Sequence, residues 1–162
     1  MRMERVRIPT LTLSEIDRTL VFDFFWKFSK LERSLKEGEF LRAGRDQAAG
    51  VDWRRFGNQI SGRFPQVPIP GFQEAVEVLK RLSPKRQIVN NNQLLDWETI
   101  ERGSHEADEE FVLKLLRTVR NNLFHGGKYQ AGLMEELARD QEIMKAASCV
   151  LDGILSLLSS PE

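Results

Sequence analysis

The sequence is poor in residues that cross-link small proteins or bind soft metals, with one cysteine and two histidines among 162 residues. A lone cysteine, Cys149, forms no intramolecular disulfide, and a cysteine-based zinc site needs several thiolates. Net charge is also missing, because 24 Lys and Arg residues balance 24 Asp and Glu residues. This balance weighs against a protein that coats nucleic acid non-specifically, which needs a broad excess of cations, but it permits a local basic site.

Long apolar runs are absent as well. No uncharged apolar stretch approaches the ~20 residues that span a bilayer, and the N-terminal residues lack the apolar core of a signal peptide. We therefore expect a cytoplasmic protein with no membrane association. The composition, 41% hydrophobic and 30% charged, is ordinary for a globular protein, and the length predicts one domain over residues 1–162 with a proper core.

What the sequence does contain is apolar residues at helical spacing. The expected helices are a first from Ser14 to Gly38, a weaker second from Asp52, a third over 72–82, a fourth over 106–124 and a last from Asp140. Phe25 and Trp26 widen the apolar face of the first helix, which places it deep in the domain or at a subunit interface. A loop-rich insertion is expected around 58–104. Long helices and short connectors, with no strand pattern of any length, predict an all-α antiparallel helical bundle.

The residues with distinctive chemistry lie near the end of the fourth expected helix. Between residues 111 and 130 there are four cations and no acid, which makes a local basic patch. The cations are Lys114, Arg117, Arg120 and Lys128. His125 stands among them and can act as a general acid or base near neutral pH, while the guanidinium of Arg120 suits a phosphate. Such a group is suited to RNA cleavage with the ribose 2′-OH as internal nucleophile, a reaction that requires no metal.

The spacing of these residues constrains how they meet. Asn121 and His125 are four apart and share a helix face, so the Asn121 amide can orient the imidazole, and Arg117 lies on the same line. Arg120 and His125 are five apart, about 140° around a regular helix. They converge only if the helix unwinds near the glycines at 126–127, or if a second subunit completes the site.

The motif and its surroundings resemble the HEPN family. Arg120-Asn121-x-x-x-His125 matches the Arg-x4–6-His signature, in which a polar residue often follows the arginine, and residues 120–128 are similar to a bacterial and plasmid-borne HEPN subgroup. Further similarity lies at an aromatic pair, a Phe-Ser pair and an acid in the opening helix, and at the entry to the last helix: residues 24–25, 28–29, Glu32 and 139–140.

The resemblance implies a bundle of four core helices plus short additional helices, which forms a homodimer and brings two motifs together across one cleft. It implies that Arg120 and His125 act on RNA, leaving a 2′,3′-cyclic phosphate, often in toxin–antitoxin or phage-defence settings with an antitoxin protein as partner. Arg117, Lys128 and Asn122 are expected to support RNA binding. No metal or cofactor is expected. The segment 58–104 departs from the family, and it either covers the cleft or alters partner choice.

Other interpretations stay open. Some HEPN domains bind RNA, a nucleotide or a partner protein without cleaving, and a structural helical dimer with a coincidental motif is a third reading. His125 is also suited to capping the last carbonyls of a helix, and Arg120 to a solvated surface. Asn122 fits an ordinary helix end. The sequence does not decide whether Glu32 pairs with Arg120.

Overall fold

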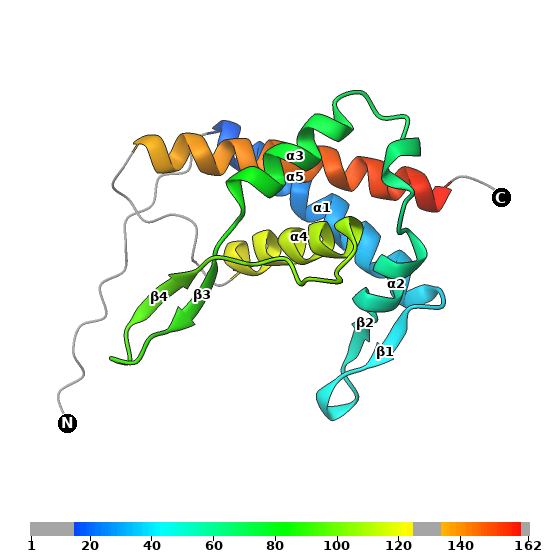
Figure 1. Cartoon of the computed structure of the whole chain (residues 1–162), viewed down its shortest axis with the longest axis horizontal. Coiled ribbons are helices and arrows are strands. Elements are labelled where there is room, and N and C mark those ends of the chain that lie inside the picture. Colours follow the sequence, from blue (N-terminus) through cyan, green and yellow to red (C-terminus); the bar gives the residue numbers. More distant parts are fainter. Residues whose placement is uncertain (1–14, 125–133, 160–162) are drawn as a thin grey trace.

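The computed structural model describes residues 15–124 and 134–159 and is mostly helical, with 64% helix and small antiparallel sheets (Figure 1). The helices are α1 (Glu15–Glu37), α2 (Trp53–Gln59), α3 (Phe72–Leu82), α4 (Asp108–Phe124) and α5 (Met134–Ser159). Short 3-10 turns cover Arg45–Gln47 and Phe64–Gln66. The expected helical class is therefore confirmed. None of the described helices combines the length and the apolar character needed to cross a bilayer.

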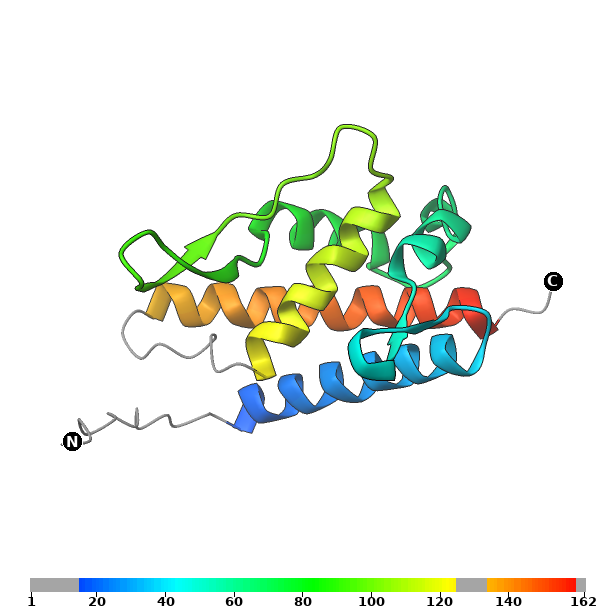
Figure 2. The ribbon, with the colours of Figure 1, turned by 90° about the horizontal axis from the view of Figure 1, so that it is seen from below.

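The helices pack around one shared core, in which α5 contacts both α1 and α3. Figure 2 shows α1 and α5 side by side with α4 running obliquely across them. The pairing of Asp23 with Ser148 and of Lys27 with Asp152 shows that α1 and α5 run in the same direction. The end of α3 at Leu82 contacts Arg139 near the start of α5, and its start at Phe72 lies beside Gly153, so α3 and α5 are antiparallel. The expected antiparallel arrangement therefore holds for α3 against α5 but not for α1 against α5.

The helix boundaries follow local signals in most cases. Asp52 caps α2, because its carboxylate accepts a hydrogen bond of 3.1 Å from the backbone N–H of Arg55. The fully buried Phe24 and Leu31 lie on the core-facing stripe of α1, as their spacing predicts. The expected start of the last helix at Asp140 is wrong, since α5 begins at Met134 and Asp140 lies inside it. Its polar first turns gave no apolar periodicity to follow.

Two antiparallel hairpins correct the expectation that the chain has no strands. β1 (Leu41–Ala43) pairs with β2 (Ala49–Val51), and β3 (Arg86–Val89) pairs with β4 (Leu95–Glu98). The second hairpin lies inside the segment expected to be loop-rich. The strands are only three or four residues long and most of their side chains are exposed, so the brief alternation of apolar and polar residues in Leu95–Glu98 is too short to indicate a strand.

The turn between β3 and β4 is built by an asparagine side chain. The Oδ1 atom of Asn90 accepts hydrogen bonds from the backbone N–H groups of Asn92 at 2.9 Å and Leu94 at 3.1 Å. Gln93 takes a left-handed backbone conformation with φ of 60°. Asparagine favours such turns because its side chain mimics a backbone hydrogen bond. The polar Asn90–Asn92 run therefore starts a hairpin rather than a loop.

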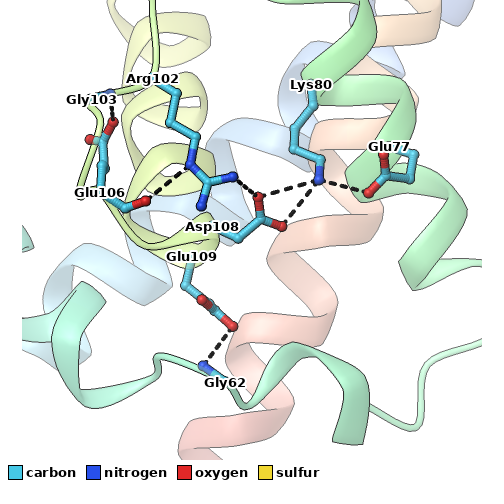
Figure 3. Close-up of polar contacts among 8 residues, drawn as sticks. All are labelled: Gly62, Glu77, Lys80, Arg102, Gly103, Glu106, Asp108 and Glu109. Carbon is cyan, nitrogen blue, oxygen red and sulfur yellow. Dashed lines mark hydrogen bonds and ion pairs between the residues drawn. The ribbon is translucent and has the colours of Figure 1, made fainter.

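Ion pairs and buried hydrogen bonds fix the start of α4 against its neighbours (Figure 3). The Asp108 carboxylate accepts hydrogen bonds from Lys80 of α3 at 3.1 Å and from Arg102 at 2.9 Å. The buried Glu109 accepts a 2.8 Å hydrogen bond from the backbone N–H of Gly62. These contacts also place acids in the first turn of α4, where they favour the helix dipole. They set the direction in which α4 presents its last turns.

Candidate functional site

Arg120 lies in the last turns of α4, at the surface between α4 and α1. Its guanidinium carbon lies 5.8 Å from the ring centroid of Phe28 and 5.6 Å from that of Phe124. Both distances fall within the range of cation–π attraction. The side chain remains 36% exposed, so the two rings hold the guanidinium at the surface while leaving it accessible.

Two polar neighbours orient the same guanidinium. Its Nη1 donates a 2.8 Å hydrogen bond to Oδ1 of Asn121, and its Nη2 lies 3.6 Å from Oε2 of Glu32. The sequence left the partner of Glu32 open, and the structure places this acid facing Arg120. Glu32 also pairs with Lys36 at 3.0 Å. An ion pair of 3.6 Å at a partly exposed site is weak, so a phosphate can replace the carboxylate beside Arg120.

A small hollow lies directly beside Arg120. Its volume is about 330 Å³. It is lined by Phe25, Phe28, Ser29, Glu32, Arg120 and Phe124. Phe124 is the last residue of α4, and the predicted catalytic His125 and the predicted RNA-binding Lys128 lie outside the described residues. The predicted contact between Asn121 and His125 therefore stays a prediction, whereas Asn121 contacts Arg120 directly.

Arg117 lies one turn earlier on α4, with its guanidinium carbon 5.5 Å from the ring centroid of Trp53. Burial of the guanidinium lowers the pKa of Arg117, repulsion from Arg120 lowers it further, and attraction to Glu32 acts in the opposite direction. An arginine shifted down from its very high ordinary pKa stays charged at neutral pH. Arg117 and Arg120 thus place two positive charges side by side on α4.

Asn122 occupies a different position from the other predicted site residues. It is 6% exposed, and its Nδ2 donates a 2.8 Å hydrogen bond to the backbone carbonyl of Lys85. Lys85 directly precedes β3, so this contact attaches the β3–β4 hairpin to α4. The contact is structural, and the expected role of Asn122 in RNA binding remains a prediction.

A second and larger groove lies between α4 and the β3–β4 hairpin. Its volume is about 1030 Å³. The lining residues are Arg86, Gln87, Ile88, Trp97, Glu98, Thr99, Ile100, Glu101, Lys114, Arg117, Thr118, Asn121 and Asn122. We call this the hairpin groove. Asn121 lines it and also holds Arg120, so the groove starts at the predicted motif. The sequence did not predict this groove, because the strands of the hairpin that forms one wall are too short to be recognised from their pattern.

Four large aromatic residues are exposed on α1 and at the end of α4. The exposed fractions are 66% for Phe22, 41% for Phe25, 57% for Trp26 and 58% for Phe124. Phe22 and Trp26 stack with ring centroids 6.5 Å apart, and Phe25 and Phe124 lie 5.6 Å apart. We call these four residues the aromatic patch. It borders the hollow beside Arg120, and an exposed apolar cluster of this kind is typical of an interaction surface.

A serine–lysine contact between α1 and α5 is structural. Lys27 Nζ donates to Oγ of Ser148 at 2.9 Å, and lies 2.8 Å from carboxylate oxygens of both Asp23 and Asp152. Although burial lowers the pKa of Lys27, the hydrogen bonds to Asp152 and Asp23 outweigh burial and raise it. A lysine that activates a serine must lose its proton. The raised pKa of Lys27 keeps it charged at neutral pH, so its contacts join the two helices and do not activate Ser148.

Comparison with known proteins found no matching family model, no matching curated protein and no matching solved structure. Within residues 15–124 and 134–159, no three potential metal-ligating side chains lie together. The function of the protein is therefore inferred from the residues around Arg120.

Proposed function

We propose that this protein is a HEPN-type, metal-independent endoribonuclease. It cleaves RNA through the ribose 2′-OH, leaves a 2′,3′-cyclic phosphate, and acts as a toxin or defence component restrained by an antitoxin protein. The observation that carries the proposal is the setting of Arg120, which is held by Phe28 and Phe124 and stays partly exposed beside a hollow. These contacts orient the guanidinium and leave it accessible to a ligand in the hollow.

The chemistry assigns one role to each motif residue. The 2′-oxygen attacks the adjacent phosphorus, the bond from phosphorus to the 5′-oxygen breaks, and the 2′ proton is transferred in net to that leaving oxygen. His125 accepts or donates this proton, because histidine is the side chain whose ordinary pKa lies near neutrality. Arg120 binds the phosphate and stabilises the charge that develops on its oxygens. Asn121 supports this role through its 2.8 Å hydrogen bond with Arg120.

The active form in this proposal is a homodimer joined through the aromatic patch. Phe25 and Phe124 of the patch line the hollow beside Arg120, so a second copy seated on the patch brings the second motif to the same cleft. A shared cleft also overcomes the separation of about 140° between Arg120 and His125 on one helix. The exposed rings then become the buried core of an interface, where aromatic residues are enriched.

The test is cleavage of an end-labelled RNA in EDTA by the wild type, Arg120→Ala and His125→Ala. Removing Arg120 is expected to slow cleavage about 10²–10³-fold, as for other groups that stabilise transition-state charge. Removing His125 is expected to slow it about 10²–10⁴-fold. A cyclic phosphate end is identified by its resistance to phosphatase until mild acid opens the ring, which distinguishes it from a linear phosphate.

The matched control is Arg42→Ala, which removes an exposed arginine from β1, away from the motif. It is purified in the same way and should cleave like the wild type, so loss of cleavage in Arg120→Ala and His125→Ala alone excludes both a contaminating ribonuclease and a general effect of removing an arginine. Equal cleavage by all four proteins contradicts the proposal. If all four bind RNA and none cleaves it, the protein is a non-catalytic HEPN module.

A further inference from the structure

The hairpin groove has the side chains that a single-stranded nucleic acid requires. One wall is α4, which contributes Lys114, Arg117 and Thr118, and the other is the hairpin, which contributes Gln87 and Trp97. Cations hold backbone phosphates, amides bond to base edges, and a partly exposed indole such as that of Trp97 stacks on a base. The volume of about 1030 Å³ lies at the upper end of the range for ligand sites.

We infer that the hairpin groove binds the single RNA strand next to the scissile phosphate, with a base stacked on Trp97 and a phosphate held by Arg117. This inference rests on the proposed nuclease function, and it assigns the β3–β4 hairpin as the element that positions the substrate. Asn121 connects the two regions, because it bonds to Arg120 and also lines the groove. A strand leaving Arg120 along the polar face of α4 therefore enters the groove.

The groove is lined by three cations and by the acids Glu98 and Glu101, and Arg117 is the cation that is not paired with a glutamate among the described residues. Arg86 and Lys114 are each paired with a glutamate, Glu98 and Glu106 respectively, so they contribute little net field. Arg117 has a cation–π contact with Trp53 as its main support, and repulsion from Arg120 disfavours its charge. A phosphate between Arg117 and Arg120 relieves that repulsion. One base-stacking surface beside one available cation is the minimal set for a nucleotide.

The experiment measures binding without cleavage. The probe is a fluorescent oligonucleotide of randomised sequence with 2′-O-methyl groups, which lack the nucleophile, and the readout is anisotropy with the full chain. Trp97→Ala is expected to weaken binding about tenfold, within the range for the loss of one base–aromatic stack. Arg117→Gln is expected to weaken binding and to reduce the slope of log affinity against log salt by about 0.7, as for one phosphate contact on a single strand.

Two controls separate the groove from general effects. Val89→Ala changes an exposed residue of the same hairpin that does not line the groove, and Arg42→Gln removes an exposed arginine from the other hairpin. Both are expected to bind like the wild type. Because Arg117→Gln leaves the hairpin intact, it tests the groove even if Trp97→Ala disturbs β4. Photo-crosslinking of RNA that contains 4-thiouridine should label the β3–β4 hairpin.

The outcomes distinguish the groove from the proposed enzyme. If the wild type cleaves RNA through His125 while both groove variants bind the probe like the wild type, the groove inference is wrong and the enzyme proposal stands. If the wild type binds through the groove but never cleaves, the groove inference stands and the enzyme proposal fails. If the wild type binds no RNA, or if a peptide alone occupies the groove, the inference is overturned.

Discussion

At the scale of single residues, the main features of this protein are close contacts that sequence patterns do not reveal. The spacing of Arg120 to His125 predicts that Arg120 belongs to the site, but nothing in the sequence predicts its contacts with the rings of Phe28 and Phe124. The two rings come from different helices, and α1 and α4 are joined by 70 residues of intervening chain in which no local signal fixes the crossing. The sequence shows that an arginine is present at this position, whereas its contacts depend on how the helices pack.

Gly153 is another residue whose role appears only in the packing. A Cβ atom added there would lie 2.2 Å from ring atoms of Phe72 and 2.9 Å from Cγ1 of Val67. Alanine is the better helix former by about 1 kcal/mol. Overpacking costs about 1–3 kcal/mol and should exceed that gain. We expect Gly153→Ala to lower the free energy of unfolding by up to about 2 kcal/mol, measured by urea denaturation.

The control for this prediction is a double-mutant cycle with Phe72→Leu. If the clash with the ring is the cause, Gly153→Ala should cost less in the Phe72→Leu background than in the wild type. Equal costs in the two backgrounds would show that the loss has another origin. A gain in stability on Gly153→Ala would mean that α3 moves away from α5 at little cost.

At the scale of elements, long helices were predictable and short hairpins were not. The stripe of α3 and the Asp52 cap of α2 are local signals, and both elements are found where they were expected. The β3–β4 hairpin depends on one Asx turn at Asn90 and on attachment through Lys85, with little burial of its faces. Periodicity indicates a strand only when it is sustained, so strands of four residues with no fully buried side chain give too short a pattern to recognise.

The contact between α1 and α5 should make stability depend on pH. Although burial raises the pKa of Asp23, hydrogen bonds from Lys27 and Ser148 outweigh burial and lower it. A lowered carboxyl pKa stabilises the fold above the unfolded value of about 3.9, and this contribution is lost as the pH falls through the folded pKa. The raised pKa of Lys27 stabilises the fold below about 10.5, with loss as the pH rises further. The full contribution is therefore present across neutral pH.

We expect Asp23→Asn to lower the free energy of unfolding by about 1 kcal/mol at pH 7, a value discounted for the partial exposure of this acid. The difference from the wild type should shrink as the pH falls below about 4 and through the folded pKa of Asp23, because the wild type then loses the same charge by protonation. Urea denaturation at several pH values measures both effects. Glu142→Gln, which neutralises an exposed acid of α5, should show neither. A difference that does not change with pH would show that the Asp23 charge is unimportant.

At the scale of the whole molecule, the aromatic patch is the most direct evidence on assembly. The sequence placed α1 deep in the domain or at a subunit interface, and the structure shows that one face is buried and another exposed. Helical spacing identifies a wide apolar face without showing which part of it the same chain covers. A site shared by two chains is therefore proposed from the exposed part of this face.

Trp26→Glu tests the proposed dimer. A charge in the middle of an apolar interface is expected to abolish association, because its burial is not compensated. Sedimentation should then show a monomer where the wild type is a dimer, and cleavage should fall with the dimer fraction. Leu41→Glu is the matched control, since it charges an exposed apolar residue of β1 outside the patch. A wild type that stays monomeric at high concentration would refute the shared cleft.

The common direction of α1 and α5 has a practical consequence. α5 ends at Ser159 on the side of the molecule opposite to the end of α4, where Arg120 and the aromatic patch lie (Figure 2). A tether attached just after Ser159 would therefore leave the motif and the patch facing away from the support. Protein immobilised in that orientation would leave the motif and the patch accessible to the RNA and to the second copy that we propose.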